Sequence, residues 1–476
     1  MKNERSANLP VAVIGAGPVG LAAAAELIGR NMQVVVLEAG PQVGANIRHW
    51  GHVKMFSPWR YNIARATRPL LVAAGWQEPD LDSIPTGQDL VSQYLDPLAG
   101  LPALREVLRV GTRVTAITRV GLDKLKDADR ESRPFLLRLL QDGKEVDLYA
   151  RAVIDCSGTY THPNFGGAHG IAARGERAQA GQIAYGMPDV LGAHRVRYAG
   201  KRVAVLGSGH SATGVILDLI SLRLEQPTTQ ILWLSRRKDL RLAFGGGAAD
   251  ALPARGALGT RLRAAVDAGD VSVVHPFALD EISLDGDALV LTGMDGRSVT
   301  ADELVVATGF RPDLAMLGEI RLDFDTALEC PRSLAPLIDP NIHSCGTVRP
   351  HGAMELAQPE TGFYVAGMKS YGRAPTFLLA TGYEQVRSIV AELAGDHEAA
   401  ARVELDLPET GVCSTDFHPD LHGAAASCCG GAPKADVSAC CVADEAAKAA
   451  GAAGCGCSDT AAPVHVPVAR TASCCG

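Results

Sequence analysis

The sequence predicts an α/β fold with two units of parallel strands and helices, the second inserted into the first. Three observations lead to this prediction. A short apolar strand near the start runs into a glycine-rich turn and an alanine-rich helix, and the same arrangement returns at residues 202–214. Nine of the twelve cysteines lie beyond residue 412, which sets the end of the chain apart. With 476 residues and 47% apolar content, the chain is long enough for two or three domains.

The first glycine-rich turn has the spacing G-x-G-x-x-G, with Gly15, Gly17 and Gly20 between a buried strand and a helix that begins near Pro18. Such glycines permit a tight turn, close approach of a pyrophosphate and close packing of helix on strand, while the helix N-terminus supplies hydrogen-bond donors. The following strand, Q-V-V-V-L-E, ends in Glu38, which can accept hydrogen bonds from a ribose. We therefore predict a Rossmann-like dinucleotide site, with a glycine turn that holds no ligand as the alternative.

The second turn, in R-V-A-V-L-G-S-G-H-S-A-T-G, places Gly207, Gly209 and Ala212 in the spacing G-x-G-x-x-A. Because the turn again joins an apolar strand to a helix, it predicts a second dinucleotide site.

The strand after the second turn, Q-I-L-W-L-S, ends in Arg236 and Arg237, where the first unit has a glutamate. Guanidinium groups at this strand end favour the 2′-phosphate of NADPH, which a carboxylate would repel. We interpret these arginines as NADPH-binding residues. The alternative is that one or both are solvated surface charges.

The two units also end in similar segments. The stretches A-R-A-V-I-D-C-S-G at residues 150–158 and A-D-E-L-V-V-A-T-G at residues 301–309 both read as buried strands that end in glycine. Each follows a segment with strand and turn signals, L-L-R-L-L-Q-D-G-K-E-V and A-L-V-L-T-G-M-D-G-R-S-V. The chain therefore looks duplicated. The later stretch G-F-Y-V-A-G-M-K-S-Y-G-R-A-P-T-F-L-L should return to the first domain.

This order predicts the domain bounds. The first domain takes residues 1–195 and 310–395, the second takes residues 196–309, and a flexible tail takes residues 396–476. The tail is rich in Ala, Gly, Ser and Asp and has few large apolar side chains, so we do not expect it to fold alone.

Residues 10–395 resemble the two-dinucleotide-binding-domain flavoproteins, which include flavin-containing monooxygenases and the thioredoxin-reductase group. The segment A-T-G-F-R-P at residues 307–312 resembles their linking signature. The resemblance implies FAD at the first glycine turn and NADPH at the second. The residues that it assigns to cofactor binding are Gly15, Gly17, Pro18, Gly20, Glu38, Trp50, Gly207, Gly209, His210, Ser211, Ala212, Arg236, Arg237, Thr308, Gly309, Gly367 and Met368.

The sequence departs from these families at three places. Trp50 lies in V-G-A-N-I-R-H-W, an imperfect match to the G-G-x-W of monooxygenases, and residues 185–201 replace their F-x-G-x-x-x-H motif. Ala366 and Gly367 are followed by Met368 and Lys369 instead of the acid of the reductases, so the contacts to the flavin must differ.

A helix that begins near Pro375 would point its N-terminus at the carbonyl edge of the flavin. The residues from Met368 to Thr376 would then line the flavin. Core packing alone is the alternative for this segment.

The cysteines of the predicted core bear on the chemistry. A disulfide reductase needs two thiols beside the flavin, whereas Cys156, Cys330 and Cys345 are isolated in the sequence and a lone cysteine is more often a small buried apolar residue. The resemblance then implies a monooxygenase, in which NADPH reduces the flavin and oxygen adds to give a C4a-hydroperoxyflavin. Soft nucleophiles, including trivalent arsenic and antimony, would accept the distal oxygen. No catalytic side chain can be assigned from the sequence.

The tail carries adjacent cysteines, and adjacent thiolates on a flexible chain suit trivalent arsenic. S-C-C-G resembles the endings of proteins of bacterial arsenic-resistance operons, and residues 345–379 resemble flavoproteins found there. A zinc-binding appendage, an oxidisable thiol store and a dispensable extension are the alternatives. The predicted metalloid ligands are Cys428, Cys429, Cys440, Cys441, Cys474 and Cys475.

A second group of metal-ligand types, His343, Cys345 and His351, is interpreted as ordinary polar residues near the flavin rather than as ligands.

A formal net charge of -8 and the absence of a long apolar run argue against nucleic-acid and membrane partners. The first ten residues lack an apolar signal-peptide core, which predicts a cytoplasmic protein. The expected partners are oxygen and a small-molecule or metalloid substrate, and a homodimer stays open. The leading hypothesis is an FAD- and NADPH-dependent monooxygenase of trivalent arsenicals. The alternatives are a reductase with a thiol, quinone or metal partner, and a non-catalytic metalloid sensor.

Overall fold

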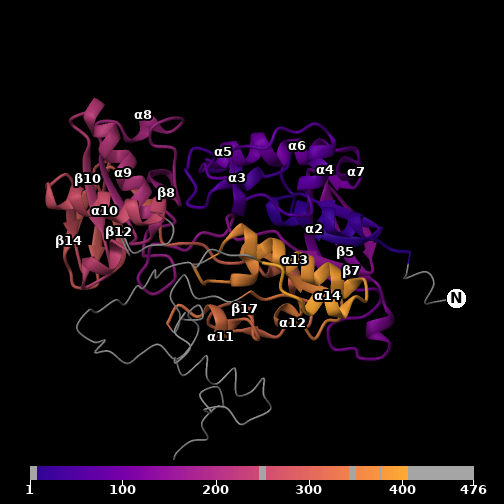
Figure 1. Ribbon diagram of the computed structural model, residues 1–476. Coiled ribbons are helices and arrows are strands. Elements are labelled where there is room, and N and C mark those ends of the chain that lie inside the picture. The colour runs from indigo at the N-terminus through magenta and orange to yellow at the C-terminus, as the bar shows by residue number, and fades with distance from the viewer. Residues whose placement is uncertain (1–7, 246–252, 342–349, 376, 406–476) are drawn as a thin grey trace, which may run out of the picture. The chain divides into compact units, whose positions relative to one another are not determined.

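Two five-stranded parallel sheets organise the chain (Figure 1). The computed structural model describes residues 8–245, 253–341, 350–375 and 377–405. The strand orders are β18-β7-β1-β2-β3 in the first sheet and β11-β10-β9-β15-β8 in the second. The prediction of an α/β fold with the second unit inserted into the first is confirmed, because β18 comes after the second sheet in sequence and completes the first.

The first sheet consists of apolar, β-branched segments that are buried on both faces, as a parallel sheet requires. Val11 and Val13 belong to the core on the helical face, while Ala12 and Ile14 belong to the core on the other face. The strands are β1 (Val11–Ile14), β2 (Val34–Leu37), β3 (Leu108–Arg109), β7 (Ala152–Asp155) and β18 (Phe363–Val365).

The second sheet repeats this pattern. Val203 and Val205 face one core, and Ala204 and Leu206 face the other. The strands are β8 (Ile183–Tyr185), β9 (Arg202–Leu206), β10 (Gln230–Leu234), β11 (Ser272–Val274) and β15 (Glu303–Val306). Strand β8 pairs with β15, although it precedes residue 196. The second unit therefore begins earlier than the boundary that the sequence predicts, because the short strand I-A-Y carries too few apolar residues to be recognised alone.

A three-stranded antiparallel sheet covers one face of each parallel sheet, and the two predicted hairpin segments form parts of these sheets. In the first unit, the strands are β4 (Thr112–Arg119), β5 (Phe135–Gln141) and β6 (Lys144–Ala150). In the second unit, they are β12 (Leu279–Asp285), β13 (Ala288–Gly293) and β14 (Ser298–Ala301). A separate small hairpin pairs β16 (Phe324–Asp325) with β17 (Cys330–Pro331).

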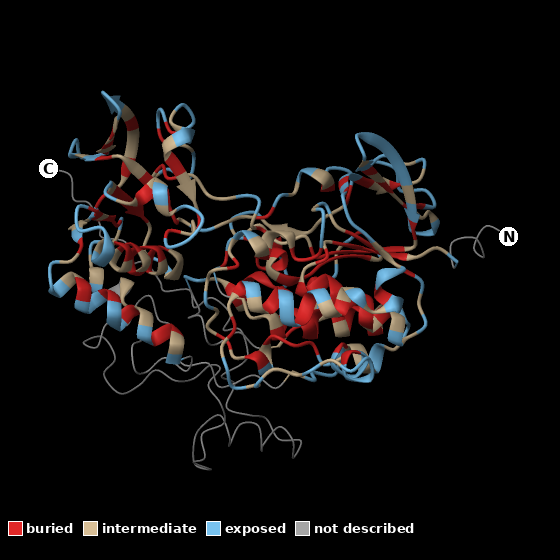
Figure 2. Ribbon diagram, turned by 90° about the horizontal axis from the view of Figure 1, so that it is seen from above, coloured by how far each residue is buried: buried red, intermediate tan, exposed pale blue. Residues whose placement is uncertain are grey.

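Helices cover the opposite faces. In the first unit, α2 (Pro18–Gly29) packs beside α13 (Leu379–Leu393), and in the second α9 (His210–Glu225) packs beside α10 (Pro253–Asp267) (Figure 1). Figure 2 shows the buried residues gathered along the strands and the inner sides of these helices. The shorter α-helices are α3 (Ala45–His49), α4 (Arg68–Ala73), α5 (Gly87–Asp89), α6 (Asp96–Gly100), α7 (Pro102–Arg105), α8 (Arg195–Tyr198), α11 (Ala335–Ile338), α12 (Ala353–Leu356) and α14 (His397–Ala401).

Single turns of other helix types complete the fold. A π-helical segment, η2 (Leu90–Leu95), follows α5. The 3₁₀ turns are η1 (Trp59–Tyr61), η3 (Arg130–Ser132), η4 (Ala180–Gln182), η5 (Leu240–Ala243), η7 (Ala315–Leu317) and η8 (Gly367–Tyr371). Within the described ranges, the helices are too short or too polar to cross a membrane.

The expected helix start near Pro375 is wrong. The chain forms η8 directly after β18, and α13 begins only at Leu379. Between them, Gly372 has φ 57°, a left-handed conformation that interrupts a helix. A Cβ at Gly372 would lie 2.0 Å from the carbonyl oxygen of Leu328, so the close approach of that segment sets the turn.

One carboxyl group of α9 works against stability. Burial raises the pKa of Asp218 to about 6, while the positive charge of Arg261 opposes this shift. Because the folded-state pKa lies above the unfolded value, ionisation of Asp218 lowers the free energy of unfolding progressively as the pH rises from about 4 to about 6, and its contribution is absent below this range. We expect Asp218→Asn to raise the free energy of unfolding by about 1–3 kcal/mol at pH 7.5. Urea unfolding at pH 7.5 and pH 4 checks this, since the gain should shrink toward the lower pH.

Candidate dinucleotide-binding sites

The first glycine turn has one crowded side and one open side. Gly15 has φ +95°, and a Cβ there would lie 2.8 Å from the carbonyl oxygen of Cys156. A Cβ at Gly20 would lie 1.9 Å from the carbonyl oxygen of Gly15. At Gly17, in contrast, a Cβ would meet nothing within 4 Å. The turn thus packs tightly against the protein at Gly15 and Gly20 and leaves space at Gly17, as a pyrophosphate-binding loop requires. These residues fit the phosphates of FAD.

Glu38 directly follows β2, beside this turn. Its carboxylate accepts hydrogen bonds from the backbone N–H groups of Ala16 and Gly40, each at 2.7 Å. The two contacts fix the carboxylate at the carboxyl edge of the sheet, and its remaining lone pairs are free to accept hydroxyl groups. This is the arrangement that ribose binding needs.

The second turn has the same geometry. Gly207 has φ +143°, and a Cβ there would lie 2.4 Å from the carbonyl oxygen of Ala307 and 3.4 Å from the Cβ of Ala212. At Gly209 a Cβ would meet nothing within 4 Å. The indole N–H of Trp233 donates a hydrogen bond of 2.7 Å to the carbonyl oxygen of Gly207 and so helps to fix the turn.

The helix α9 begins at His210 and Ser211, so the backbone N–H groups of these two residues lie in its first turn. Such N–H groups have no partner within the helix and attract anionic phosphates. The second turn therefore fits the phosphates of a dinucleotide as well as the first one does.

Arg236 and Arg237 follow the strand β10. Arg236 is exposed, and its guanidinium group donates a long hydrogen bond of 3.4 Å to the carbonyl oxygen of Ala168. The backbone N–H of Arg237 donates to the hydroxyl of Ser235, which also contacts Ser208 in the glycine turn at 2.8 Å. Both guanidinium groups thus follow a strand end that is tied to the turn by serines. Ser208 and Ser235 are not among the residues predicted from the sequence, although they lie next to the predicted motifs.

We expect Arg236→Ala with Arg237→Ala to lower kcat/KM for NADPH about 10- to 100-fold and to leave kcat/KM for NADH nearly unchanged. The reason is that a hydrogen bond to a charged group contributes about 1.5–3 kcal/mol, and NADH lacks the phosphate. Initial rates with both nucleotides measure this. An equal loss for both nucleotides would show that the arginines do not distinguish them.

The linking signature pairs with the other segment that joins the two sheets. Pro163 forms a bridge with Phe310, and the ring of Phe310 stacks on that of Tyr160 at 5.1 Å between centroids. The hydroxyl of Thr308 donates to the carbonyl oxygen of Asn164 at 3.1 Å, and Gly309 has φ +93°. Thr308 and Gly309 therefore shape the paired connection between the two sheets.

The predicted flavin residue Trp50 ends α3 and packs on α5. A Cβ at Gly87 would lie 2.7 Å from its ring, so only glycine fits beneath the indole. This contact gives Trp50 a packing role, whereas its role toward FAD stays a prediction.

Gly367 and Met368 begin η8, immediately after β18. The backbone N–H of Gly367 donates to Oε1 of Gln385 at 2.7 Å, and the amide nitrogen of Gln385 contacts Ser370 Oγ at 2.9 Å and His351 Nε2 at 2.8 Å. Since Gln385 accepts from the backbone, its nitrogen is the donor to both partners, and His351 Nε2 must be the acceptor. This network holds the turn in place.

Lys369 reaches into the protein from the same turn. It forms an ion pair with Asp155 at 2.6 Å and donates to the hydroxyl of Ser157 at 3.0 Å. The sequence marks Lys369 as a departure from the reductases and as part of the segment that is expected to line the flavin. Its partners Asp155 and Ser157 could not be found from the sequence, because the ion pair joins residues 214 positions apart.

The described part of the chain holds two free cysteines, Cys156 and Cys330, and both are buried. Burial raises the pKa of Cys156 well above its usual value and that of Cys330 to about 12. Both thiols therefore stay protonated near neutral pH and are weak nucleophiles.

In the described ranges, no group of three or more His, Cys, Asp or Glu side chains could hold a metal ion. His343 and Cys345 lie outside the described residues. The predicted metalloid ligands of the tail also lie outside them, namely Cys428, Cys429, Cys440, Cys441, Cys474 and Cys475.

Residues 9–361 match the family model of the pyridine nucleotide-disulphide oxidoreductases. The chain belongs to this family. This oxidoreductase is therefore an NADPH-dependent flavoprotein, and the prediction of FAD and NADPH as its cofactors is confirmed. Among relatives, it is 24% identical to the flavin-containing monooxygenase FMO GS-OX-like 9 of Arabidopsis thaliana over 67% of each chain.

Solved structures share the fold of this oxidoreductase. Bacillithiol disulfide reductase from Bacillus cereus superposes with a TM-score of 0.58 at 18% identity and covers 81% of this chain and 99% of its own. The FAD-bound cadaverine monooxygenase of desferrioxamine biosynthesis from Erwinia amylovora has a TM-score of 0.57 at 15% identity and covers 86% and 98%. The same fold thus occurs in reductases and in monooxygenases, so the chemistry must be inferred from the site.

Proposed function

We propose that this oxidoreductase is a monooxygenase that uses FAD, NADPH and oxygen to oxidise a trivalent arsenical, or a related thiophilic metalloid, to the pentavalent form. The observation that carries the monooxygenase assignment is the state of the cysteines. A dithiol reductase passes electrons through two neighbouring thiols, whereas Cys156 and Cys330 of the described chain are buried, have raised pKa values and belong to separate segments.

The residues of this chain bind and orient the cofactors. FAD, when bound, supplies the electron transfer and the activation of oxygen. The open face at Gly17 and the carboxylate of Glu38 would hold its phosphate and ribose groups. Gly209 and Arg236 would do so for NADPH. The overall reaction balances because NADPH and the trivalent arsenical each give two electrons to O₂. One oxygen atom goes to the arsenical, and the other leaves as water with the hydrogen of NADPH and a proton from solution.

The arsenical assignment rests on the tail, where six of the twelve cysteines form three adjacent pairs. Thiolates bind trivalent arsenic more strongly than oxygen ligands do, because both partners are soft. We propose that the pairs capture the substrate, so that a truncated chain needs a higher arsenical concentration to react at the same rate.

The test is oxygen consumption by the purified protein with NADPH, with arsenite and methylarsenite as separate substrates. We expect at least one of them to increase the rate and to gain an atom from ¹⁸O₂, detected by mass spectrometry. A chain that ends at residue 412 should keep kcat and show a raised KM. NADPH oxidation without oxygen transfer, but with reduction of an added disulfide or quinone, would favour the reductase alternative. Arsenical binding without turnover would favour the sensor.

A further inference from the structure

The buried lysine after β18 has more donors than the described residues satisfy. The side chain of Lys369 is 1% exposed and that of Asp155 is 0% exposed. The ammonium group has three N–H donors, and the described residues supply two acceptors, Asp155 Oδ2 and Ser157 Oγ. The Ser157 hydroxyl in turn donates to Asp155 Oδ1 at 2.7 Å. One buried, charged donor is thus left over, and such a donor is costly unless a further acceptor meets it.

The position of this donor points to the acceptor. Asp155 ends β7 and Lys369 follows β18, so the pair lies at the carboxyl edge of the first parallel sheet, where dinucleotides bind in this class of fold. A Cβ at Gly15 would lie 3.0 Å from the Cα of Ser157. The same edge therefore carries the glycine turn, Ser157 and the ammonium group.

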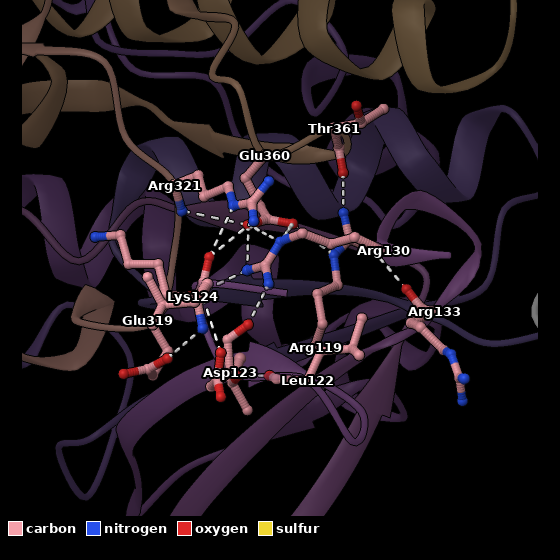
Figure 3. A network of polar contacts seen from close by, with 12 residues as sticks. Arg119, Leu122, Asp123, Lys124, Arg130, Arg133, Glu319, Arg321, Glu360 and Thr361 are labelled. Carbon is pink, nitrogen blue, oxygen red and sulfur yellow. Dashed lines mark hydrogen bonds and ion pairs between the residues drawn. The ribbon is translucent and has the colours of Figure 1, made fainter. Parts of the chain in front are cut away.

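A second buried ion-pair cluster shows what a purely structural arrangement looks like in this sheet (Figure 3). Glu360 precedes β18, at the opposite edge, and accepts hydrogen bonds from Arg119 and Arg130, each at 2.7 Å. The backbone N–H of Arg321 also donates to it at 3.2 Å. Burial opposes its ionisation, yet the bonds from the arginines lower its pKa. Both oxygen atoms of this carboxylate have partners among the described residues, whereas one N–H of the Lys369 ammonium group has none there.

We propose that Lys369 donates its third N–H to an oxygen atom of FAD, with Asp155 and Ser157 holding the ammonium in position. This assigns a cation to the edge of the sheet that carries the first glycine turn. Reduction adds negative charge to the flavin, and a nearby cation stabilises it. Lys369 therefore strengthens the binding of reduced FAD more than that of oxidised FAD. The proposal rests on the cofactor assignment and is independent of the arsenical substrate.

The test measures the dissociation constants of oxidised and reduced FAD by titration of the apoprotein, together with the midpoint potential of the bound flavin. For Lys369→Met we expect the ratio of the two constants to change at least tenfold in disfavour of reduced FAD. For a two-electron couple, this ratio corresponds to a potential lower by about 30 mV. Asp155→Asn removes the compensating charge and should shift the ratio in the opposite direction.

Two further variants keep the test decisive. A single change leaves one charge buried without its partner and can unfold the protein, whereas Lys369→Met with Asp155→Asn removes both charges and should stay folded. Glu360→Gln is the matched control, because it disrupts a buried pair at the other edge and should lower stability without changing the ratio. An unchanged affinity for FAD in the double variant, which lacks the N–H donor, or shifts of the same sign in both single variants, would overturn the proposal. Neither outcome would touch the assignment of the substrate.

Discussion

Gly17→Val should give a folded protein that binds FAD at least 100-fold more weakly and is colourless as purified. The backbone at Gly17 is extended, with φ -81° and ψ -173°, which a β-branched residue adopts readily. A Cβ there meets no protein atom within 4 Å, so the added methyl groups enter the space that the pyrophosphate would occupy. The measurements are the flavin absorbance of the purified protein and an FAD titration.

Gly29→Val is the matched control for this change. Gly29 ends α2, and a Cβ there also meets nothing within 4 Å, but it lies away from the turn. The free energy of unfolding of both variants should lie within about 1 kcal/mol of the wild-type value, as is usual for surface substitutions. If Gly17→Val keeps its yellow colour, the first turn does not hold FAD.

Gly209→Val should give the complementary result, a yellow protein that NADPH no longer reduces at a useful rate. Gly209 is also extended, with φ -94° and ψ 178°, and a Cβ there meets nothing within 4 Å. Since we assign FAD to the other turn, we expect the flavin content to equal that of the wild type and dithionite still to reduce the flavin. We expect the rate of reduction by NADPH, followed by stopped-flow absorbance, to fall at least 100-fold.

Gly214→Val serves as the control for the second turn. Gly214 lies inside α9, and a Cβ there meets nothing within 4 Å. This variant should keep the wild-type rate of flavin reduction. A loss of flavin from Gly209→Val would contradict the assignment of the two turns to different cofactors.

The sequence was sufficient to predict those features that depend on neighbours in the chain. The spacing of Gly17 and Gly20 predicts part of the turn from neighbours in the chain, because a Cβ at Gly20 would meet the carbonyl oxygen of Gly15 and one at Gly17 would meet nothing. The obstacle at Gly15, the carbonyl oxygen of Cys156, is distant in the sequence. The burial of β7 and β15 also follows from local apolar runs.

Features that depend on distant contacts could not be predicted in this way. The left-handed turn at Gly372 is set by Leu328, and it delays the helix that the sequence suggested near Pro375. The ion pair of Lys369 with Asp155 joins two strand ends that become neighbours only when the sheet forms. The strand β8 carries too little local signal, and its place follows from its pairing with β15.

The late arrival of β18 in the sequence has a consequence for biosynthesis. The ribosome must complete residues 363–365 before this edge strand can pair with β7, whereas the strands of the second sheet all lie between residues 183 and 306. Domains generally fold as units during synthesis. The second unit can therefore fold on the nascent chain while the first waits for its last strand, and the side chain of Lys369 reaches Asp155 only after that strand has paired.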